Sequence, residues 1–586
     1  MAEEKQQKAS GKKQDIIEEI RDKVDDYEVN FSGFIAEFND WFDIFTVKKP
    51  LRRQNTKTFS NPRSTEMLRA VNALATLELR MMTANDPYFD IAPMDISLDN
   101  RKLSIIQSTL ETQLDITQHK RYLLKALISK ILFGTVIVEE PYQTYGLNPF
   151  GRKMAATGFV PRSLLQVAFE RNTSDIDNAD WLSTADVITK QRLMSLARED
   201  AEGKVWIKSE IDAAIADDSP MPNQNQYIIN RLSRSGYDGE QSQKYVRELL
   251  IYRGKLDTLN DGIEYVVGLV NRKYLVRFHA NNFQHGKRNF RVARWLEVEL
   301  EPLAYGQGKL LASLHKSIDA NRQKYQDSIT FDTYSMWLMD RMGGINAQDL
   351  KIRPMQIIEA DNVNAMKRLE SNVGGATLGL KLEDLLKAEF RAASGATDTL
   401  QALVTEATAS EVSLAQNEAL RNISVKAEIA AASLVREHIE VMHANNIQYQ
   451  NEPFNVNVRG KTTKVYPADL WYDVDFRVKI VTDKDYKPQR LKSLVEMLTV
   501  LTSIRNEHPE KYQISIIPIV EEIARSLGVN AEALILPPQP GNQLQALLGQ
   551  GGATDAPGLP PPEFTGNIPG GLPVVDTPVG AVLASP

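Results

Sequence analysis

The sequence contains no cysteine in 586 residues. This absence excludes disulfide bonds, thiolate zinc sites, iron–sulfur clusters and cysteine nucleophiles, so stability must come from packing and assembly. Long apolar runs are also missing: the best candidates, 135–138 and 514–520, are far shorter than the roughly 18 residues of a membrane-spanning helix. Residues 1–14 are rich in lysine, glutamate and glutamine and lack the apolar segment of a secretory signal. We therefore expect a soluble intracellular protein.

Basic residues are in the minority. The chain has 69 lysines and arginines against 76 aspartates and glutamates, a formal charge of −7 and a pI near 5.7. Because proteins that clamp nucleic acid carry mainly basic surfaces, any contact with DNA should be weak or local. The 42% hydrophobic and 25% charged residues are an ordinary globular composition. At roughly 150 residues per domain, the length predicts about four units.

Signatures of catalysis are absent as well. The sequence has no Gly-x-x-x-x-Gly-Lys-Ser/Thr phosphate loop and no Gly-x-Ser-x-Gly nucleophile elbow. The nearest glycine-rich candidate, Gly306-Gln307-Gly308-Lys309, lacks the spacing of a phosphate loop or a dinucleotide site, and we interpret it as the turn that starts a helix. We expect no enzymatic activity, no catalytic residue and no cofactor.

Two patterns resemble metal sites without matching them. His438 and His443 are five residues apart, one more than the pair that shares a zinc ion on a helix, and we interpret them as part of a solvated helix face. The run Asp175–Asp180 has the first two aspartates of a calcium loop, but Ala179 stands where an oxygen ligand is required. We expect a capped turn before Trp181 and no metal-binding residue.

An aromatic helix is predicted near the N-terminus. Aromatic residues recur there at three- and four-residue steps, which places them on one helix face: Phe31, Phe34, Phe38, Trp41, Phe42 and Phe45. A face so apolar must be covered. Two alternatives stay open: packing within the chain, or packing against a neighbouring subunit.

The next segments alternate between helix and strand. A helix capped by Ser64 or Thr65 should end near 85–87, and a second long helix should cover Asp99 to Leu132. Gly134 is placed to end that helix, and the β-branched run 135–138 predicts a strand directly after it.

Residues 150 to 300 show a mixed pattern. Short strands are predicted around Val160 and at 227–232, 245–252, 263–270 and 274–278, which favours an α+β unit with an antiparallel sheet. We expect Trp181 to Ala197 to be a helix inserted in it.

The C-terminal half is predominantly helical. A helix starts near 307, Gly343-Gly344 breaks it, and a compact segment of about 30 residues extends to Gly374-Gly375. Further elements are predicted as follows: a helix at 378–390, an interruption at 394–397, a very long helix at 402–445 with a buried stripe of small residues, strands within 453–481, and helices at 486–505 and 518–527. From Pro537 on, 20 of 50 residues are proline or glycine, and we expect a disordered tail.

Several of these features, in their order, resemble the portal proteins (head–tail connectors) of tailed bacteriophages, with podovirus-like portals as the nearest type. The resemblance covers about 60 to 535. It is carried by Phe133-Gly134-Thr135-Val136 between helix and strand, Asp177-Asn178-Ala179-Asp180-Trp181 before a wing helix, Arg294-Trp295 and Tyr305-Gly306 before the first stem helix, and Thr405-Glu406-Ala407-Thr408-Ala409-Ser410-Glu411-Val412 at the start of the long wing helix. The last segment differs from the family's pattern in residue order and at Ser410.

The resemblance implies an α+β, mainly helical portal fold that forms a ring of twelve subunits around a channel. The implied parts are an N-terminal arm and aromatic helix (1–46), an α+β wing (47–306), a first stem helix (307–335), a small α/β clip (336–375), a second stem helix (376–393), a tunnel loop (394–407), the long wing helix and wing strands (408–483), crown helices (484–536) and the Pro/Gly-rich tail (537–586).

The resemblance also implies candidate site residues. The tunnel loop would contribute Ser394, Gly395, Thr397, Asp398, Thr399 and Gln401, which are small or polar and can touch DNA without gripping it. Stem cations that could face DNA are Lys309, Lys316, Arg322, Lys324, Lys381 and Lys387. The alternative for the stem cations is a solvated face, or salt bridges between subunits with Asp319, Asp327 and Glu383. In the clip, candidates for binding terminase or adaptors are Asp340, Arg341, Asp349, Lys351, Arg353 and Met355.

The implied function is a channel at one capsid vertex through which double-stranded DNA passes into the capsid during packaging and out of it during ejection, without sequence specificity. The implied partners are the large terminase subunit, head–tail adaptor and tail proteins, and the major capsid and scaffold proteins, with no membrane. The expected location is the virion, with assembly in the host cytoplasm. The main alternative is another structural virion protein, such as a minor capsid or tail adaptor protein. An ATP-dependent packaging enzyme or nuclease is disfavoured by the missing motifs.

Overall fold

The structure is a computed structural model that describes residues 12–48, 62–85, 87–94, 99–146, 153–170, 173, 175–199, 205–217, 246–286, 288–299, 301–333, 337–339, 366–368, 374–395, 422–458, 461–478, 495–502 and 523. The chain divides into two compact units, Met1–Tyr486 and Lys487–Pro586. In the second unit, 495–502 form a helix inside the predicted 486–505. All other described elements belong to the first unit. The predicted α+β class is confirmed, and more than half of the well-placed residues are helical.

The N-terminal helices are α2 (Lys13–Asn30), α3 (Ser32–Phe45) and α4 (Glu66–Thr83). The aromatic face of α3 is covered by the chain itself. The ring of Phe38 stacks on Phe133 with centroids 3.9 Å apart, and Phe31 meets Phe169 edge-on at 5.5 Å. Phe38 and Trp41 are buried, so the aromatic stripe forms core within one chain.

The long helix predicted over 99–132 is two helices, α5 (Asn100–Ile116) and α6 (His119–Phe133). Asp99 caps α5 by accepting a hydrogen bond from the backbone N–H of Arg101. The break falls at Gln118, whose φ of 53° is left-handed and cannot continue a helix. Residues on both sides of it, Thr117 and His119, are buried. Tertiary burial of these polar side chains therefore overrides a continuous helical periodicity.

Gly134 ends α6 as predicted, with φ at 89°. The strand predicted after it is β2 (Thr135–Glu139), every residue of which is buried. β2 is the centre of a three-stranded antiparallel sheet in the order β11-β2-β5, with β11 at Phe290–Arg294 and β5 at Val160–Arg162. A hairpin of β3 (Tyr142–Gly146) and β4 (Lys153–Thr157) follows β2 in the chain.

The predicted antiparallel sheet is present. Its five strands run in the order β10-β9-β8-β7-β6. They are β6 (Val167–Phe169), β7 (Trp181–Thr189), β8 (Val246–Lys255), β9 (Glu264–Val270) and β10 (Tyr274–Ala280). Short helical turns η1 (Leu164–Gln166) and η2 (Ile176–Asn178) precede β6 and β7, and α8 (Lys208–Ala216) packs against β10.

The helix predicted over Trp181–Ala197 is wrong in its first half, which is strand β7, and only α7 (Lys190–Glu199) is helical. The nine residues of β7 pair with β8 along their whole length, from Trp181 opposite Gly254 to Thr189 opposite Val246. A partner strand that satisfies every backbone group decides the conformation here, where the sequence pattern alone is ambiguous.

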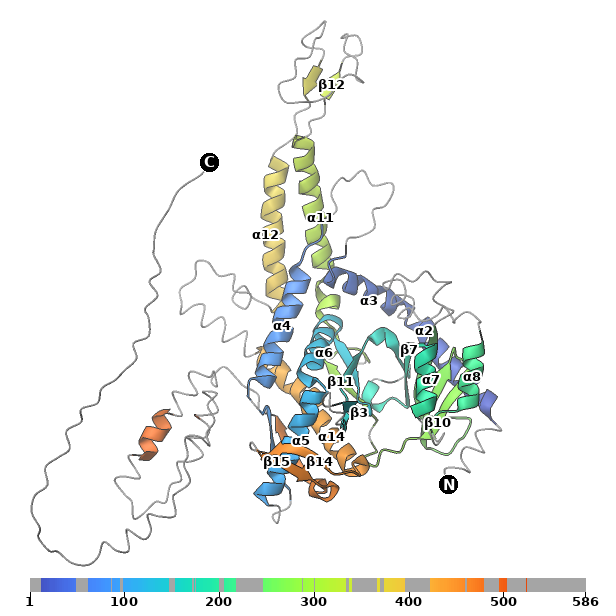
Figure 1. The fold of residues 1–586 in the computed structure, drawn as a ribbon. Helices are drawn as coiled ribbons and strands as arrows, with labels where there is room; N and C mark the ends of the chain where they lie inside the picture. Colours follow the sequence, from blue (N-terminus) through green and yellow to red (C-terminus); the bar gives the residue numbers. More distant parts are fainter. Residues whose placement is uncertain are drawn as a thin grey trace, which may run out of the picture. The chain divides into compact units, whose positions relative to one another are not determined.

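A long antiparallel hairpin of α11 (Gln307–Thr333) and α12 (Gly374–Ser394) projects from the rest of this unit (Figure 1). The helices predicted from 307 and over 378–390 are therefore present. At a rise of 1.5 Å per residue, α11 is about 40 Å long. Beyond its tip, β12 (Trp337–Met339) and β13 (Met366–Arg368) pair antiparallel.

The end of the predicted long helix is also present. Residues 422–431 are helical, a π-helical turn η4 (Ala432–Arg436) follows, and α14 (Glu437–Tyr449) completes the run. The described part of the predicted stripe is buried: Ile423, Ala427, Ala430, Leu434 and Val441. The predicted strands within 453–481 are β14 (Phe454–Val458), β15 (Lys461–Val465) and β16 (Val474–Val478), with a turn η5 (Pro467–Leu470).

β14 pairs with β15, and β16 pairs with β1 (Phe89–Pro93), both antiparallel. None of the described helices is both long and apolar enough to cross a bilayer. Several predictions lie outside the described residues: the strand at 227–232, the break at Gly343-Gly344, the start of the long helix at 402–421 and the tail from Pro537.

Candidate functional site

Three of the segments that carry the portal resemblance meet at the base of the hairpin. The backbone N–H of Trp295 donates to the carbonyl of Gly134 at 2.8 Å, and Tyr305 N–H donates to Leu296 at 2.8 Å. Gly134 and Gly306 lie backbone against backbone, so a side chain at Gly306 would overlap Gly134. We call this junction the hairpin base. It joins the end of α6, the start of β2 and the start of α11.

The glycine-rich run at 306–309 is part of this base. α11 begins at Gln307, and Gly308 lies against the indole of Trp41 and the carbonyl of Leu132 with no room for a side chain. Its interpretation as the turn that starts a helix is confirmed. The glycines serve close packing of α11 on α3 and α6.

A fourth segment of the resemblance is tied to the same region. The guanidinium of Arg294 pairs with Asp175 and, at 3.2 Å, with Asp177. Asp175 also accepts from the N–H of Asp177, which confirms the predicted capped turn. This turn precedes strand β7, so the expectation that it introduces a wing helix is wrong. The fifth segment, at 405–412, lies outside the described residues.

Trp295 is buried beside a fully buried ion pair. Lys130 Nζ lies 2.7 Å from Glu78, and both side chains have no exposed area. Lys130 and Lys426 approach the Trp295 ring at 5.3 and 3.7 Å from its centroid. Burial raises the pKa of Glu78 and lowers the pKa of Lys130, and their mutual attraction opposes both shifts. The Glu78–Lys130 pair, Lys426 and Trp295 together hold α4, α6 and the helix at 422–431 against the hairpin base.

The two hairpin helices interlock along their length. Phe390 of α12 is fully buried and meets His315 of α11 edge-on at 5.9 Å. Further along, the amide of Asn321 donates to the carbonyl of Gly379 at 2.7 Å, and Gly379 lies against the side chain of Tyr325. A larger residue at Gly379 would force the helices apart.

An ion network crosses the same interface. Glu383 accepts from Arg322 Nε at 3.1 Å and pairs with Lys387 at 2.7 Å. Burial alone would raise the pKa of Glu383, but hydrogen bonds from Arg322, Lys387 and Tyr325 outweigh it and lower this pKa to about 2. The carboxylate therefore stays ionised at physiological pH.

The stem cations that sequence reasoning placed toward DNA are mostly engaged inside the chain. Lys309 pairs with Glu37 at 3.0 Å and Lys316 pairs with Asp40 at 2.6 Å, both on α3. Arg322 and Lys387 share Glu383, as described above. Lys324 and Lys381 are exposed and form no ion pair with any described residue.

The acidic residues considered as partners between subunits are also placed. Glu383 is occupied within the chain, and Asp319 accepts from Arg63 at 3.1 Å and from the N–H of Ser64 at 2.6 Å. Asp327 is buried. Ser64 further contributes to capping α4, because its hydroxyl accepts from the N–H of Glu66 at 3.4 Å.

The start of the predicted tunnel loop closes the hairpin at its base. The carbonyl of Ser394 accepts from the side chain of Gln307 at 3.0 Å, which ties the end of α12 to the start of α11. Gly395 follows with a left-handed φ of 71°. The other loop candidates, Thr397, Asp398, Thr399 and Gln401, lie outside the described residues, as do the clip candidates Asp340, Arg341, Asp349, Lys351, Arg353 and Met355.

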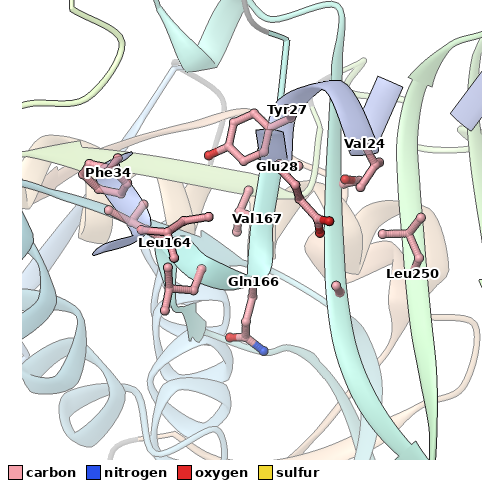
Figure 2. A pocket seen from close by; sticks show the side chains of 13 residues that line it. Val24, Tyr27, Glu28, Phe34, Leu164, Gln166, Val167 and Leu250 are labelled. Atoms are coloured by element: carbon pink, nitrogen blue, oxygen red, sulfur yellow. The ribbon is translucent and has the colours of Figure 1, made fainter. Parts of the chain in front are cut away.

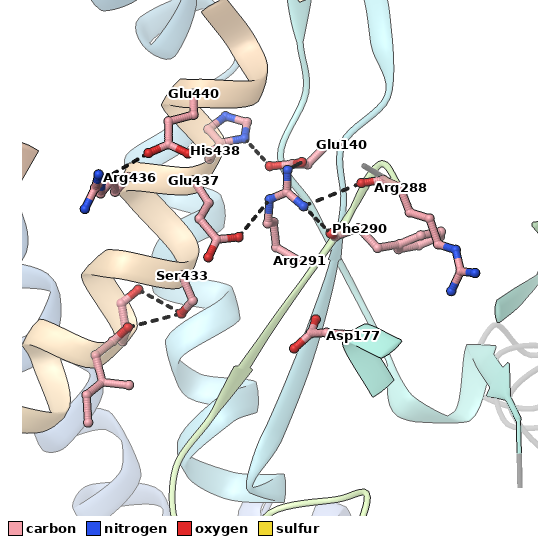
Figure 3. A network of polar contacts seen from close by, with 12 residues as sticks. Glu140, Asp177, Arg288, Phe290, Arg291, Ser433, Arg436, Glu437, His438 and Glu440 are labelled. Atoms are coloured by element: carbon pink, nitrogen blue, oxygen red, sulfur yellow. Dashed lines mark hydrogen bonds and ion pairs between the residues drawn. The ribbon is translucent and has the colours of Figure 1, made fainter. Parts of the chain in front are cut away.

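His438 and His443 are buried, so their interpretation as a solvated helix face is wrong. His438 Nδ1 lies 2.7 Å from Glu140 (Figure 3). Arg291 of β11 pairs with Glu140 at 3.4 Å and with Glu437 at 3.5 Å, so one arginine links strand and helix (Figure 3). α14 is packed on more than one side by sheets and by α5, and this buries positions that a surface helix would expose.

His119 extends this buried network. Its ring stacks on His438 with centroids 5.1 Å apart and planes 4° from parallel, and its Nδ1 lies 3.0 Å from the hydroxyl of Tyr88. Burial, and next the neighbouring His438, lower the pKa of His119 well below its ordinary value. Sequence reasoning missed this network because its members are up to about 300 positions apart and no local motif joins them.

Neither the network nor the rest of the described chain forms a metal centre: no group of three histidine, aspartate or glutamate side chains is placed to hold an ion among the described residues. The cavity under α2 and α3, lined among others by Tyr27, Phe34, Leu164 and Leu250, has a free volume of about 20 Å³ (Figure 2). That space holds about one water molecule and no organic ligand. Comparison with protein-family models finds no match for the chain, and comparison with curated proteins finds no significant relative.

Proposed function

We propose that this chain is a portal subunit, which assembles into a ring at a capsid vertex and forms the channel for double-stranded DNA. The observation that carries the proposal is the projecting α11–α12 hairpin with apolar side chains on its outside. The order of the local motifs resembling portal proteins supports it, because four of those segments converge on the hairpin base.

The outer side of α12 is a row of uncovered leucines. Leu378, Leu382 and Leu385, at helical spacings of four and three, are 69%, 48% and 68% exposed. The side of α12 that faces α11 is complete, since Phe390 and Glu383 are buried there. Because the inner side of α12 is already packed on α11, an apolar outer side needs a second partner.

A closed ring supplies that partner without a second kind of protein. In a head-to-tail ring each copy offers one face to the next copy and receives the opposite face of the previous one, so every exposed row is covered once. A hairpin that projects from the unit lets these rows align around a central axis. The interface of each copy would then include the leucine row of α12.

The charge distribution suits a channel through which DNA slides. Each fixed cation that neutralises a phosphate adds affinity and so resists movement of the duplex. In the hairpin, Lys309, Lys316, Arg322 and Lys387 are compensated by carboxylates of the same chain. The chain as a whole carries −7. Terminase, adaptor and coat proteins would be the partners of such a ring.

Negative-stain electron microscopy of the purified chain tests the proposal. We expect class averages with a twelvefold ring and a central hole. Particles that show neither a hole nor rotational symmetry, even after incubation with the scaffold protein at high concentration, would favour a tail adaptor or minor capsid protein instead.

A further inference from the structure

Two buried histidines join the start of α6 to α14. The rings of His119 and His438 are stacked with their centroids 5.1 Å apart, and their side chains are 1% and 0% exposed. Phe159 meets both rings edge-on, at 4.7 Å from His119 and 5.1 Å from His438. A positive charge on either ring is therefore stabilised only by neighbouring side chains and backbone groups.

The two rings differ in their partners. Glu140 lies 2.7 Å from Nδ1 of His438, so a carboxylate can balance a proton on that ring. Nδ1 of His119 lies instead 3.0 Å from the hydroxyl of Tyr88, which is uncharged. No described carboxylate contacts His119. The stack can hold a proton beside Glu140, but it has no counter-charge for a second proton on His119.

The start of α6 also opposes a positive charge on His119. His119 is the first residue of this helix, where the helix dipole is positive, and Lys120 and Arg121 follow in the same turn. Among the described residues, the backbone of Leu434 is the one group that favours the charged ring. Burial and the neighbouring His438 outweigh it, in agreement with the lowered pKa of His119.

The carboxylate of Glu140 is already shared. Arg291 lies 3.4 Å from Glu140 and 3.5 Å from Glu437, whose side chain is 44% exposed (Figure 3). The other charged side chains on this part of the long helix, Arg436 and Glu440, pair with each other at 3.0 Å. Glu140 is therefore the carboxylate that reaches the stack, and it cannot balance two charged rings and an arginine.

The stack lies where both helices are irregular. His119 follows Gln118, whose left-handed backbone separates α5 from α6. Leu434 belongs to the π-helical turn η4 directly before α14, and such turns are frequent at functional sites. A ring that leaves this position can free the contact between the helices without breaking a regular helical turn.

We infer that the His119–His438 stack is a proton-sensitive joint, which holds the start of α6 against α14 while His119 is neutral and opens locally when acid protonates His119. The open ring meets water and binds a proton near its ordinary value of 6.5, whereas the packed ring does not. The joint is therefore fully stable above about pH 6.5 and weakens as the pH falls below it. This inference is independent of ring assembly.

Hydrogen exchange of the full chain, followed by mass spectrometry from about pH 7.5 to 5, tests the joint. Amide protection in peptides covering 117–123 and 434–440, corrected for the intrinsic effect of pH, should fall by up to about tenfold per pH unit below pH 6.5. His119→Phe keeps a buried ring that cannot take up a proton, and it should abolish this fall. The matched control is His315→Gln, at a buried histidine of α11, which should keep the slope of the parent in both peptides.

An equal fall in the parent and in His119→Phe would overturn the inference, because other groups would then carry the response. A simultaneous loss of protection in all peptides would also overturn it, since the opening would be global. If His119→Phe does not fold, deuterium exchange at C2 of the histidine rings in the parent chain decides the same point. We expect His119 to titrate well below 6.5, and a midpoint at or above 6.5 would contradict the joint.

Discussion

At the scale of single residues, Gly134 holds the junction between the body and the hairpin. Its φ is 89°, and a side chain there would overlap the carbonyl of Ala304 and the backbone of Gly306. Gly262 has a similar φ of 68° but open space around it. The pair thus separates backbone strain from steric overlap.

We predict that Gly134→Ala destabilises the chain by about 3 kcal/mol or more, because strain and overlap add. Gly262→Ala should cost only about 1 kcal/mol, from the left-handed backbone alone. Denaturant unfolding of both variants measures the difference. Equal losses at the two positions would show that the hairpin base is loosely packed.

A half-buried histidine gives the chain a predictable response to acid. Burial, followed by the nearby Arg277, lowers the pKa of His279 to about 4 from its ordinary 6.5. Between these two values the unfolded chain binds a proton that the folded chain does not. Stability linked to His279 is therefore full above about pH 6.5 and is lost as the pH falls toward 4.

We predict that His279→Gln flattens the pH dependence of the unfolding free energy by up to about 1.4 kcal/mol per pH unit between pH 6.5 and 4. Above pH 6.5 the variant and the parent should show parallel curves. Urea titrations at a series of pH values provide the measurement. An unchanged slope in the acidic window would mean that His279 is protonated alike in the folded and unfolded chains.

At the scale of elements, the leucine row of α12 is the feature that assembly should cover. Burying one leucine in an interface contributes about 1.5 to 3 kcal/mol. The double variant Leu378→Gln, Leu385→Gln should therefore shift the assembly toward monomers while leaving the thermal unfolding of the monomer nearly unchanged. Met194→Gln, on the partly exposed face of α7, is the control. Mass photometry over a concentration series measures the assembly state of the double variant and of the control. Identical mass distributions for the two would contradict the assignment of the leucine row to an interface.

Elements specified by local sequence could be predicted, and elements specified by distant partners could not. The end of α6 at Gly134 and the strand β2 after it follow from a left-handed glycine and four β-branched residues in a row. The prediction of a helix over β7 fails because the strand's partner β8 is distant in the chain, from Thr189 opposite Val246 to Trp181 opposite Gly254. The break at Gln118 likewise depends on the burial of His119 against His438. No local sequence pattern predicts that contact.

The candidate sites divide in the same way. The segments at 133–136, 294–295 and 305–306 could be picked from the sequence, but their convergence at the hairpin base is a property of the fold. The stem cations were named from the resemblance, whereas their carboxylate partners Glu37 and Asp40 come from a different helix.

At the scale of the whole molecule, the proposed ring would make each chain a repeating unit whose exposed surfaces are completed by its neighbours. A projecting hairpin, an uncovered leucine row and compensated stem charges each suit a ring through which an anionic polymer moves.

Mass photometry of the purified full chain, as its concentration is raised and after scaffold protein is added, tests the central claim most directly. The account predicts one dominant species of about 790 kDa, twelve times the 65.8 kDa of a single chain. A chain that stays at 65.8 kDa, or stops at a dimer, under every one of these conditions would contradict it.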